Sequence, residues 1–462
     1  MAELHTDYRS TLDSIFPPVI QSWILCFPCE PSAYDTIASS LREGLNRTLD
    51  QDPRLGGELV WEDIGRLKLV YSDKRDKEDE RFTVNDLTNN SDVWSLSYTN
   101  LAKRGAPVAA LKRHDVLSPP GGYQRLASLP VSGQANFIPG GCLLYVTLHH
   151  SLMDGTGAAT ILSAWARNCK AVQDGDVAKQ VPALSLSLPE ALQGTAAPLG
   201  ADIDRIREDA TLWQALGLQK PTNDPPNWAF PSGEGLVPAI FGASAVAISR
   251  LKAASAPATG FISSFDAIAA LVWRCVMRAR YSDLGDTASD ITSNLRLPVN
   301  VRQAVGIPEE YSGNAILFSV TSMSLDSLVA EKDGSRLAAQ VRSSLSKTKD
   351  PSRARDAVKL SFVLPPPSGR VPDFSRTATH DVILSSWQDM PFYQMDWGAA
   401  FGSPGVPEFV RTDQLYSLPG LCAILQKRTG DEVEAVINLS PDQIDRLRED
   451  AEFGNYFQLK SM

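Results

Sequence analysis

The chain lacks long apolar runs and is poor in cysteine. None of its 462 residues lies in an uninterrupted apolar stretch of about 20 residues, so we expect no membrane span. Residues 1–7 carry neither a basic region nor an apolar run, and we expect no secretion signal. The six cysteines lie mostly in apolar segments, as reduced and buried thiols do. The sequence therefore favours a cytoplasmic protein.

Basic charge and the common ligand motifs are also scarce. Lys and Arg number 44 against 54 Asp and Glu, which gives a formal net charge of -10 at pH 7. No basic stripe with interleaved aromatics occurs, so we expect no nucleic-acid partner. There is no P-loop, G-x-G-x-x-G or G-x-S-x-G motif, and no metal site is predicted. An anionic ligand would need local cations, for which the candidates are Arg250, Lys252, Arg296 and Arg302.

Length and composition predict two globular domains. The chain is too long for one ordinary core, and 43% hydrophobic with 21% charged residues is typical of a globular protein. We place one half at residues 1–172 and the other at 236–462. The segment 173–235 between them is predicted to be a long crossover loop, because it has few long apolar runs and many prolines, namely Pro182, Pro189, Pro198, Pro221, Pro225, Pro226 and Pro231.

Apolar spacing predicts the main local elements. We expect strands at residues 18–30 and 142–148, a further strand after the turn that begins at Pro53, and helices at 34–49, 158–172 and 263–274. A last helix opens with Ser440-Pro441-Asp442-Gln443, a capping box with proline at its first position.

The most informative stretch is HHSLMDG at residues 149–155, directly after the strand predicted at 142–148. Neighbours in a strand face opposite ways, so His149 and His150 cannot serve one site. We predict that one of them is catalytic and the other structural. Asp154 lies at the joint with the next helix. The alternative is that His150 is a hydrogen-bonded core imidazole and Asp154 a turn or N-cap residue.

This stretch resembles the HHxxxDG signature of the BAHD acyltransferases, peptide-synthetase condensation domains, and chloramphenicol and carnitine acyltransferases, which use the second histidine as a base. Further segments point to the BAHD branch, because they occur in the order of that family: RLGGEL from Arg54, ISSFDAIAALVWR from Ile262, Asn300–Arg302, Tyr311–Ala315, Ser386-Trp387, and Tyr393–Gly398. The chain is most similar to fungal members, the trichothecene and ergot-alkaloid O-acetyltransferases, over nearly its whole length.

The resemblance implies an α/β fold of two chloramphenicol-acetyltransferase-like domains, each a mixed β-sheet with flanking helices. A channel between them would hold the histidine, with the acyl thioester and the acceptor entering from opposite ends. It implies an acyl-CoA, most often acetyl-CoA, as co-substrate and no permanently bound cofactor. The acceptor would be a hydroxyl, less often an amine, of a fungal secondary metabolite, and the protein a monomer.

The same resemblance assigns roles to residues. His150 would be the general base, with Asp154 paired to Arg302 as its structural support. Gly155, Asn314, Trp397 and Gly398 would shape the substrate channel. Coenzyme A would bind at Lys252, Ser263, Ser264 and Arg302. Family members commonly carry D-F-G-W-G where this chain has QMDWG at residues 394–398, so the role of Asp396 stays open.

The residue types agree with this chemistry. A thioester is already activated, so the enzyme must supply a deprotonated acceptor, and a neutral imidazole contributes about 10²–10⁴-fold in that task. No nucleophilic serine or cysteine is signalled beside His150, so we expect direct transfer in a ternary complex. Two alternatives remain: a BAHD fold that catalyses a cyclisation or only binds a metabolite, and a stand-alone condensation domain, although nothing here encodes its usual carrier or adenylation domains.

Overall fold

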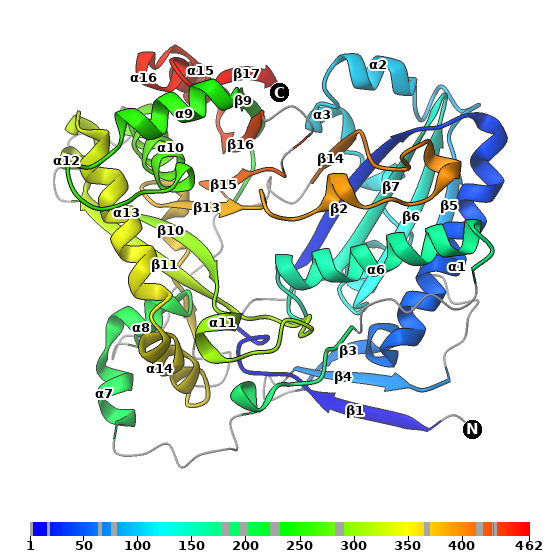
Figure 1. Cartoon of the computed structure of the whole chain (residues 1–462), viewed down its shortest axis with the longest axis horizontal. Coiled ribbons are helices and arrows are strands. Elements are labelled where there is room, and N and C mark those ends of the chain that lie inside the picture. Colours follow the sequence, from blue (N-terminus) through cyan, green and yellow to red (C-terminus); the bar gives the residue numbers. More distant parts are fainter. Residues whose placement is uncertain are drawn as a thin grey trace.

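The computed structural model describes residues 3–15, 19–62, 67–74, 81–176, 184–193, 202–221, 232–281, 291–364, 370–412, 419–426, 428 and 432–462. The molecule has two halves that lie side by side, each built on a mixed β-sheet with helices on its faces (Figure 1). This is the fold class that the sequence predicts.

The N-terminal half is built on a five-stranded sheet, whose order is β14 (Phe409–Arg411), β2 (Ile20–Pro28), β7 (Gly141–His149), β6 (Val131–Ile138) and β5 (Phe82–Asp86). Strand β5 runs parallel to β6, and the other neighbours are antiparallel. Helices α1 (Tyr34–Gln51) and α6 (Gly155–Gln173) bury their apolar sides in one core with this sheet. A smaller sheet joins β1 (Leu4–Tyr8), β4 (Leu67–Ser72) and β3 (Glu58–Trp61). The half also contains the short helices α2 (Tyr98–Lys103), α3 (Val108–Leu111), α4 (His114–Leu117) and α5 (Gly122–Leu126).

The C-terminal half is built on a seven-stranded sheet, whose order is β11 (Ile316–Ser324), β10 (Thr292–Asn300), β13 (Val382–Ser386), β15 (Leu421–Ile424), β16 (Val433–Leu439), β9 (Val237–Ala243) and β17 (Gln458–Ser461). The β10–β13–β15 strands are parallel and the outer pairs are antiparallel. Its helices are α9 (Ala245–Ala254), α10 (Ser264–Tyr281), α11 (Arg302–Val305), α12 (Leu325–Ala330), α13 (Gly334–Thr348), α14 (Pro351–Ser361), α15 (Pro441–Glu449) and α16 (Ala451–Gly454).

The elements expected from apolar spacing are present with small shifts at their ends. The strand expected at 142–148 is β7, and the helices expected at 34–49 and 158–172 are α1 and α6. Helix α15 has the predicted capping box, with Pro441 in its first turn. All six cysteines are free thiols, and five of them are buried. Within the described residues, no helix combines the length and the apolar character needed to cross a membrane.

The described part of the segment between the halves contains regular secondary structure. Its described part contains α7 (Ile203–Glu208), α8 (Ala210–Ala215) and β8 (Leu218–Gln219), which pairs with β12 (Val371–Pro372). Leu212 and Trp213 of α8 are buried in the core of the C-terminal half. The prolines on which the loop prediction rests lie outside these helices, so a short apolar helix between them was missed.

One segment of the C-terminal part of the chain packs on the N-terminal half, and we call it the exchanged segment. Residues 390–411 follow the C-terminal strand β13 in the chain, yet they pack on the N-terminal core, and β14 extends the N-terminal sheet beside β2. Trp397 and Phe401 contact Phe27 of β2. The halves in space therefore differ from the contiguous ranges 1–172 and 236–462 expected from the sequence.

Candidate active site

The HHSLMDG segment forms a tight connection between β7 and α6. Strand β7 ends at His149, whose carbonyl accepts hydrogen bonds from the Leu152 and Met153 amides at 2.9 and 3.2 Å. The side-chain amide of Gln21 on β2 donates to the Met153 carbonyl at 2.7 Å. The His150 amide donates to the Val19 carbonyl at 2.8 Å. These bonds fix the position at which His150 leaves the sheet.

The two histidines have different surroundings. His149 is fully buried, and its Nδ1 accepts a hydrogen bond from the Ser151 amide at 3.1 Å. Burial, together with the neighbouring His150, lowers the pKa of His149 to about 4. His150 keeps part of its surface exposed. His149 is therefore a neutral structural group, and His150 is the histidine that a substrate can reach.

Burial also lowers the pKa of His150 below its ordinary value. Its own backbone carbonyl, the Asp154 carboxylate and the Asn314 side chain act in the opposite direction, because each favours the protonated ring. The net effect keeps the imidazole neutral near pH 7, which is the form that accepts a proton.

Asp154 and Arg302 form a buried bidentate ion pair between the two halves. Arg302 Nη1 lies 2.8 Å from Asp154 Oδ2, and Arg302 Nη2 lies 3.0 Å from Asp154 Oδ1. The amides of Gly157 and Ala315 donate to the same two oxygens at 3.0 and 2.9 Å. Each carboxylate oxygen thus accepts two hydrogen bonds, so Asp154 caps α6 and joins the halves rather than relaying a proton.

Two other predicted channel residues lie close to this loop. The Asn314 side-chain amide donates to the His150 carbonyl at 2.8 Å. A side chain at Gly155 would meet Met390, since a Cβ built there lies 2.3 Å from the Met390 Cε. Glycine at this position therefore permits the close approach of the exchanged segment to the start of α6.

Trp397 and Gly398 lie elsewhere, which corrects the expectation that they line the channel. The Trp397 ring is fully buried and packs 5.6 Å from that of Trp165. Gly398 has φ 102° and lies against Gln173, the last residue of α6, whose amide donates to the Trp397 carbonyl. Eighteen residues of helix, about 27 Å, separate Gln173 from Gly155. Asp396 forms an ion pair with Lys170 and accepts from the Gly398 amide, so it has a structural role in this loop.

Several residues predicted to bind coenzyme A gather at the start of α10. Lys252 Nζ lies 5.4 Å above the ring of Phe261, which is 66% exposed. Helix α10 begins at Ser264. Across its first turn, the Ser263 amide donates to the Asp266 carboxylate and the Asp266 amide donates to the Ser263 hydroxyl. Arg342, which the sequence analysis missed, lies over the same ring at 5.5 Å and pairs with Asp266. Nothing in the local sequence at α13 signals this contact.

Two of the other candidate cations, Arg302 and Arg296, form ion pairs with buried carboxylates. Arg302 is committed to Asp154 and to the Tyr311 and Gly313 carbonyls. Arg296 is fully buried and pairs with Asp373 and Asp381 at 2.7 and 3.3 Å. The guanidinium of Arg302, predicted as a coenzyme contact, is thus held in the Asp154 pair.

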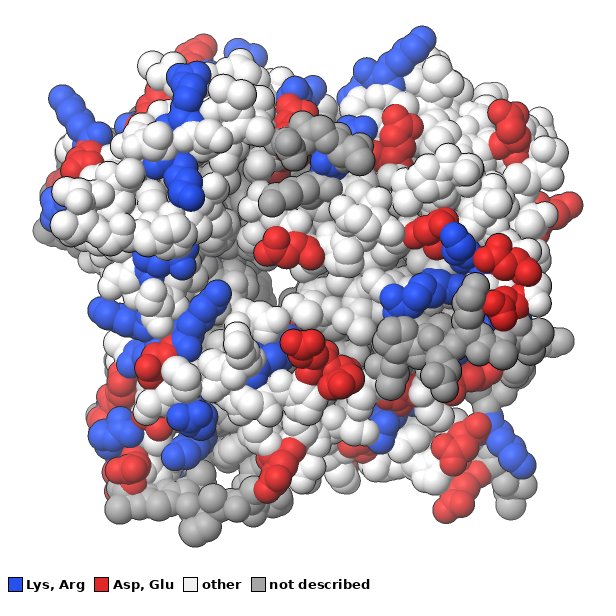
Figure 2. All heavy atoms as spheres, viewed as in Figure 1, with Lys and Arg blue, Asp and Glu red and all other residues white. Residues whose placement is uncertain are grey.

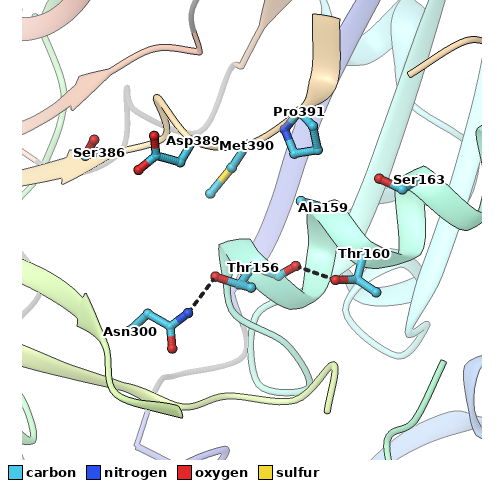
Figure 3. A pocket seen from close by; sticks show the side chains of 9 residues that line it. All are labelled: Thr156, Ala159, Thr160, Ser163, Asn300, Ser386, Asp389, Met390 and Pro391. Atoms are coloured by element: carbon cyan, nitrogen blue, oxygen red, sulfur yellow. Dashed lines mark hydrogen bonds between the residues drawn. The ribbon is translucent and has the colours of Figure 1, made fainter. Parts of the chain in front are cut away.

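A hollow of about 430 Å³ opens between the halves at the first turns of α6. Figure 2 shows the surface hollowed near its centre, and Figure 3 shows the residues around the space. His150 is not among the lining residues, which are Thr156, Ala159, Thr160, Ser163, Asn300, Ser386, Asp389, Met390 and Pro391. The small lining residues of α6 recur at helical spacing and so share one face of that helix, a pattern that the sequence analysis did not use to predict the hollow.

One group of side chains has the composition of a metal site. Cys275, Asp450 and Glu452 place ligand atoms within 4.8 Å of one another. Arg278 donates to both carboxylates, at 2.9 Å to Asp450 and 2.6 Å to Glu452. Arg274 pairs with Glu452 as well, so two guanidinium groups balance the two carboxylates, and we interpret the group as an ion-pair cluster.

Two family models match the chain. The Transferase family model matches residues 236–454, and that of the trichothecene 3-O-acetyltransferase-like N-terminal domain matches residues 21–169. The chain belongs to the BAHD-type acyltransferase family. The protein is therefore an acyltransferase enzyme.

Similar proteins cover the full length. An eremophilane O-acetyltransferase of Penicillium roqueforti is 24% identical over 97% of this chain and 97% of its own. A trichothecene 3-O-acetyltransferase of Fusarium sporotrichioides is 27% identical over 95% of this chain and 94% of its own. The structure of TRI101 from F. graminearum with coenzyme A and T-2 mycotoxin has the same fold, with a TM-score of 0.81 and 22% identity, over 99% of this chain and 100% of that one.

The Asp154–Arg302 pair predicts a stability defect. Asp154→Ala leaves a buried guanidinium uncompensated, which typically costs about 3–5 kcal/mol, and Arg302→Ala leaves a buried carboxylate with the same effect. The double variant should be only slightly worse than either single variant, because both remove one interaction. Denaturant unfolding measures all three free energies. Asp154→Asn and Arg302→Lys are the milder matched variants. An Asp154→Ala protein that unfolds like the parent but has lost its rate would instead indicate a chemical role.

Proposed function

We propose that His150 is the general base in the transfer of an acyl group from a coenzyme A thioester to a hydroxyl group of a small metabolite. The observation that carries this proposal is a neutral, reachable imidazole held at the end of a buried strand by backbone hydrogen bonds. The family membership supplies the class of reaction.

The chemistry needs one proton to move twice. The imidazole takes the proton of the acceptor hydroxyl while its oxygen attacks the thioester carbonyl carbon. The C–S bond of the tetrahedral intermediate then breaks, and the imidazolium returns the proton to the thiolate. The products are the ester and free coenzyme A.

We propose direct transfer, without an acyl-enzyme. Ser151, the hydroxyl nearest to His150 in the sequence, is fully buried. Burial raises the pKa of Cys26 to about 12 and that of Cys142 further above its usual value, so neither thiol supplies a thiolate near pH 7.

We propose that the coenzyme binds at the start of α10. The protein is acidic overall, so a polyanionic ligand depends on a local cation cluster, and Lys252 and Arg342 form one around Phe261. The exposed Phe261 ring offers a stacking surface for a purine base. The Ser263 and Asp266 amides are already bound to each other's side chains, so the N-terminus of the 18-residue helix α10 and the Ser264 hydroxyl are the groups that favour a phosphate.

We propose that the acceptor occupies the hollow at α6. No lining residue is basic and Asp389 is acidic, so the hollow disfavours the coenzyme phosphates. Asp389 makes no hydrogen bond or ion pair within the described part of the chain and is available to a ligand. The lining hydroxyls and the Asn300 amide favour a neutral or cationic metabolite with several polar groups over a carboxylate.

We propose further that the protein acts as a monomer in the cytoplasm. The free, mostly buried thiols agree with a reducing compartment.

Replacement of His150 tests the reaction. His150→Ala should lower turnover by about two orders of magnitude or more with the fold retained, because it removes the base. Thiol release from acetyl-CoA with a panel of fungal alcohols measures the rate. In the parent enzyme the rate should fall on acidification only below pH 6.5, since burial lowers the pKa of His150 and the protonated ring is inactive.

His149→Asn is the matched control for this variant. The Asn side-chain oxygen can still accept from the Ser151 amide, so the rate should remain close to that of the parent. Equal rate losses in both variants, with normal circular dichroism, would overturn the assignment of His150. A parent protein that turns over a metabolite without releasing thiol would instead favour a changed reaction, such as a cyclisation.

The donor site is tested by calorimetry with free coenzyme A. Lys252→Ala and a Ser263→Ala/Ser264→Ala double variant should each weaken binding, and added salt should weaken it in the parent as well. Lys349→Ala, at an exposed lysine beyond the end of α13, is the control and should bind normally. Unchanged affinity in both test variants would remove coenzyme binding from the start of α10.

The acceptor site is tested by filling the hollow. Thr160→Trp should raise the acceptor KM by about tenfold or more while the coenzyme Kd stays constant, because the indole occupies the acceptor volume. Arg167→Trp, on an exposed position two turns further along α6, is the control. A loss of coenzyme affinity in Thr160→Trp would show that the hollow belongs to the donor.

A further inference from the structure

A buried carboxylate far away in the sequence holds the residue that contacts His150. The Asn314 side-chain amide donates to the His150 carbonyl at 2.8 Å and to Asp13 Oδ1 at 3.0 Å. The Asn314 backbone amide donates to the same Asp13 oxygen at 3.2 Å. Asp13 therefore fixes both the main chain and the side chain of Asn314.

Asp13 itself is held in one orientation. It is fully buried, and its second oxygen accepts from the amide and hydroxyl of Ser10 at 2.9 and 2.7 Å. The buried Arg9 guanidinium lies 3.6 Å from that oxygen and donates to the Leu186 carbonyl. Burial raises the pKa of Asp13, and Arg9 opposes this. All of these neighbours donate, so they favour the ionised carboxylate.

This arrangement decides which way the Asn314 amide faces. A carboxylate and a carbonyl are acceptors only, so the NH₂ group must lie on the side of Asp13 and His150. The amide oxygen then has to point the other way, and it is buried. The Asn314 side chain therefore binds the His150 carbonyl, and thus the main chain that carries the imidazole, from one fixed side.

We propose that Asp13 is a positioning residue for catalysis, which fixes the main chain at His150, and with it the placement of the imidazole, through Asn314. This inference rests on the proposed role of His150 as the base.

Loss of the carboxylate would free the amide. In Asp13→Asn, the new side-chain NH₂ group would replace one of the two carboxylate oxygens. On the Ser10 side it would face the Ser10 amide and Arg9, which both donate. On the opposite side it would face the Asn314 NH₂ group, which also donates. Either way the Asn314 amide loses its fixed acceptor and can turn, which would weaken its hydrogen bond to the His150 carbonyl and let the loop that carries the ring move.

Kinetics of Asp13→Asn test the proposal. We expect kcat to fall by about tenfold or more, with the acceptor KM and the coenzyme Kd within about twofold of the parent. Ser10→Ala is the matched control, since it removes a hydroxyl bond to Asp13 but leaves the Asp13–Asn314 bonds intact. It should retain kcat within about threefold.

A double-variant cycle separates positioning from general stability. Asn314→Ala should lower kcat to a similar extent, and adding Asp13→Asn to it should cause no further loss. The acid limb of the rate profile should keep its position in both single variants, because the variants alter the placement of the ring and not the charged groups around it. The other charged or titratable neighbours are His149 and Asp154 at the ring, and Arg9 and Tyr311 at Asp13, and all stay in place. Additive losses, or an unchanged kcat in Asp13→Asn, would overturn the proposal.

A readout without turnover keeps this test independent of the proposed reaction. Nuclear magnetic resonance titration of the His150 ring reports its tautomer and pKa in the parent and in Asp13→Asn. Shifted ring resonances are expected in the variant, because the main chain that carries the ring loses its fixed contact, and an unchanged ring spectrum would overturn the proposal. An inactive His150→Ala with an unchanged ring in Asp13→Asn would leave the base assignment intact and remove only the role of Asp13.

Discussion

The ion pair between Asp154 and Arg302 is the interaction on which the site depends. It joins the start of α6 in the N-terminal half to the end of β10 in the C-terminal half, with both groups buried. A buried pair of this kind contributes little net stability compared with apolar packing, but it is strongly destabilising when one partner is removed. Its value here is geometric: it sets how the two halves meet beside His150.

The catalytic loop is held by backbone bonds and by neutral groups more than by charge. His149 is kept neutral by burial, and its ring accepts a backbone amide instead of contacting substrate. The charges of Asp154 and Asp13 are each engaged by an arginine or by several donors, so neither is free to take the proton in place of His150. When the neighbouring carboxylates already accept hydrogen bonds from other groups, the imidazole can stay neutral near pH 7 and still be held in place by its backbone contacts.

Charge also separates the two substrates. The cations around Phe261 lie at the start of α10, whereas the hollow at α6 has an acidic residue and no basic one. In a protein with net charge -10, the proposed function rests on this local arrangement, which favours a polyanionic thioester at one site and disfavours it at the other. Under that proposal the two sites hold the two substrates of a ternary complex, with His150 as the base.

The sequence by itself determined the local elements and singled out His150 as the candidate base. Strand β7, helices α1 and α6, and the capping box of α15 follow from apolar period and cap residues, which are local properties. The spacing in HHSLMDG was enough to single out His150 and Asp154, because a strand end and a helix start place them directly.

Only the tertiary structure decided which distant residues meet. Asp13 and Asn314 are 301 positions apart, and no periodicity links them. Trp397 was expected in the channel, but the exchanged segment packs it on Trp165 in the N-terminal core. The hollow likewise combines α6 with residues from β10 and the end of β13. Such contacts depend on how the sheets and helices pack, because burial of apolar faces fixes the geometry only when both halves are folded.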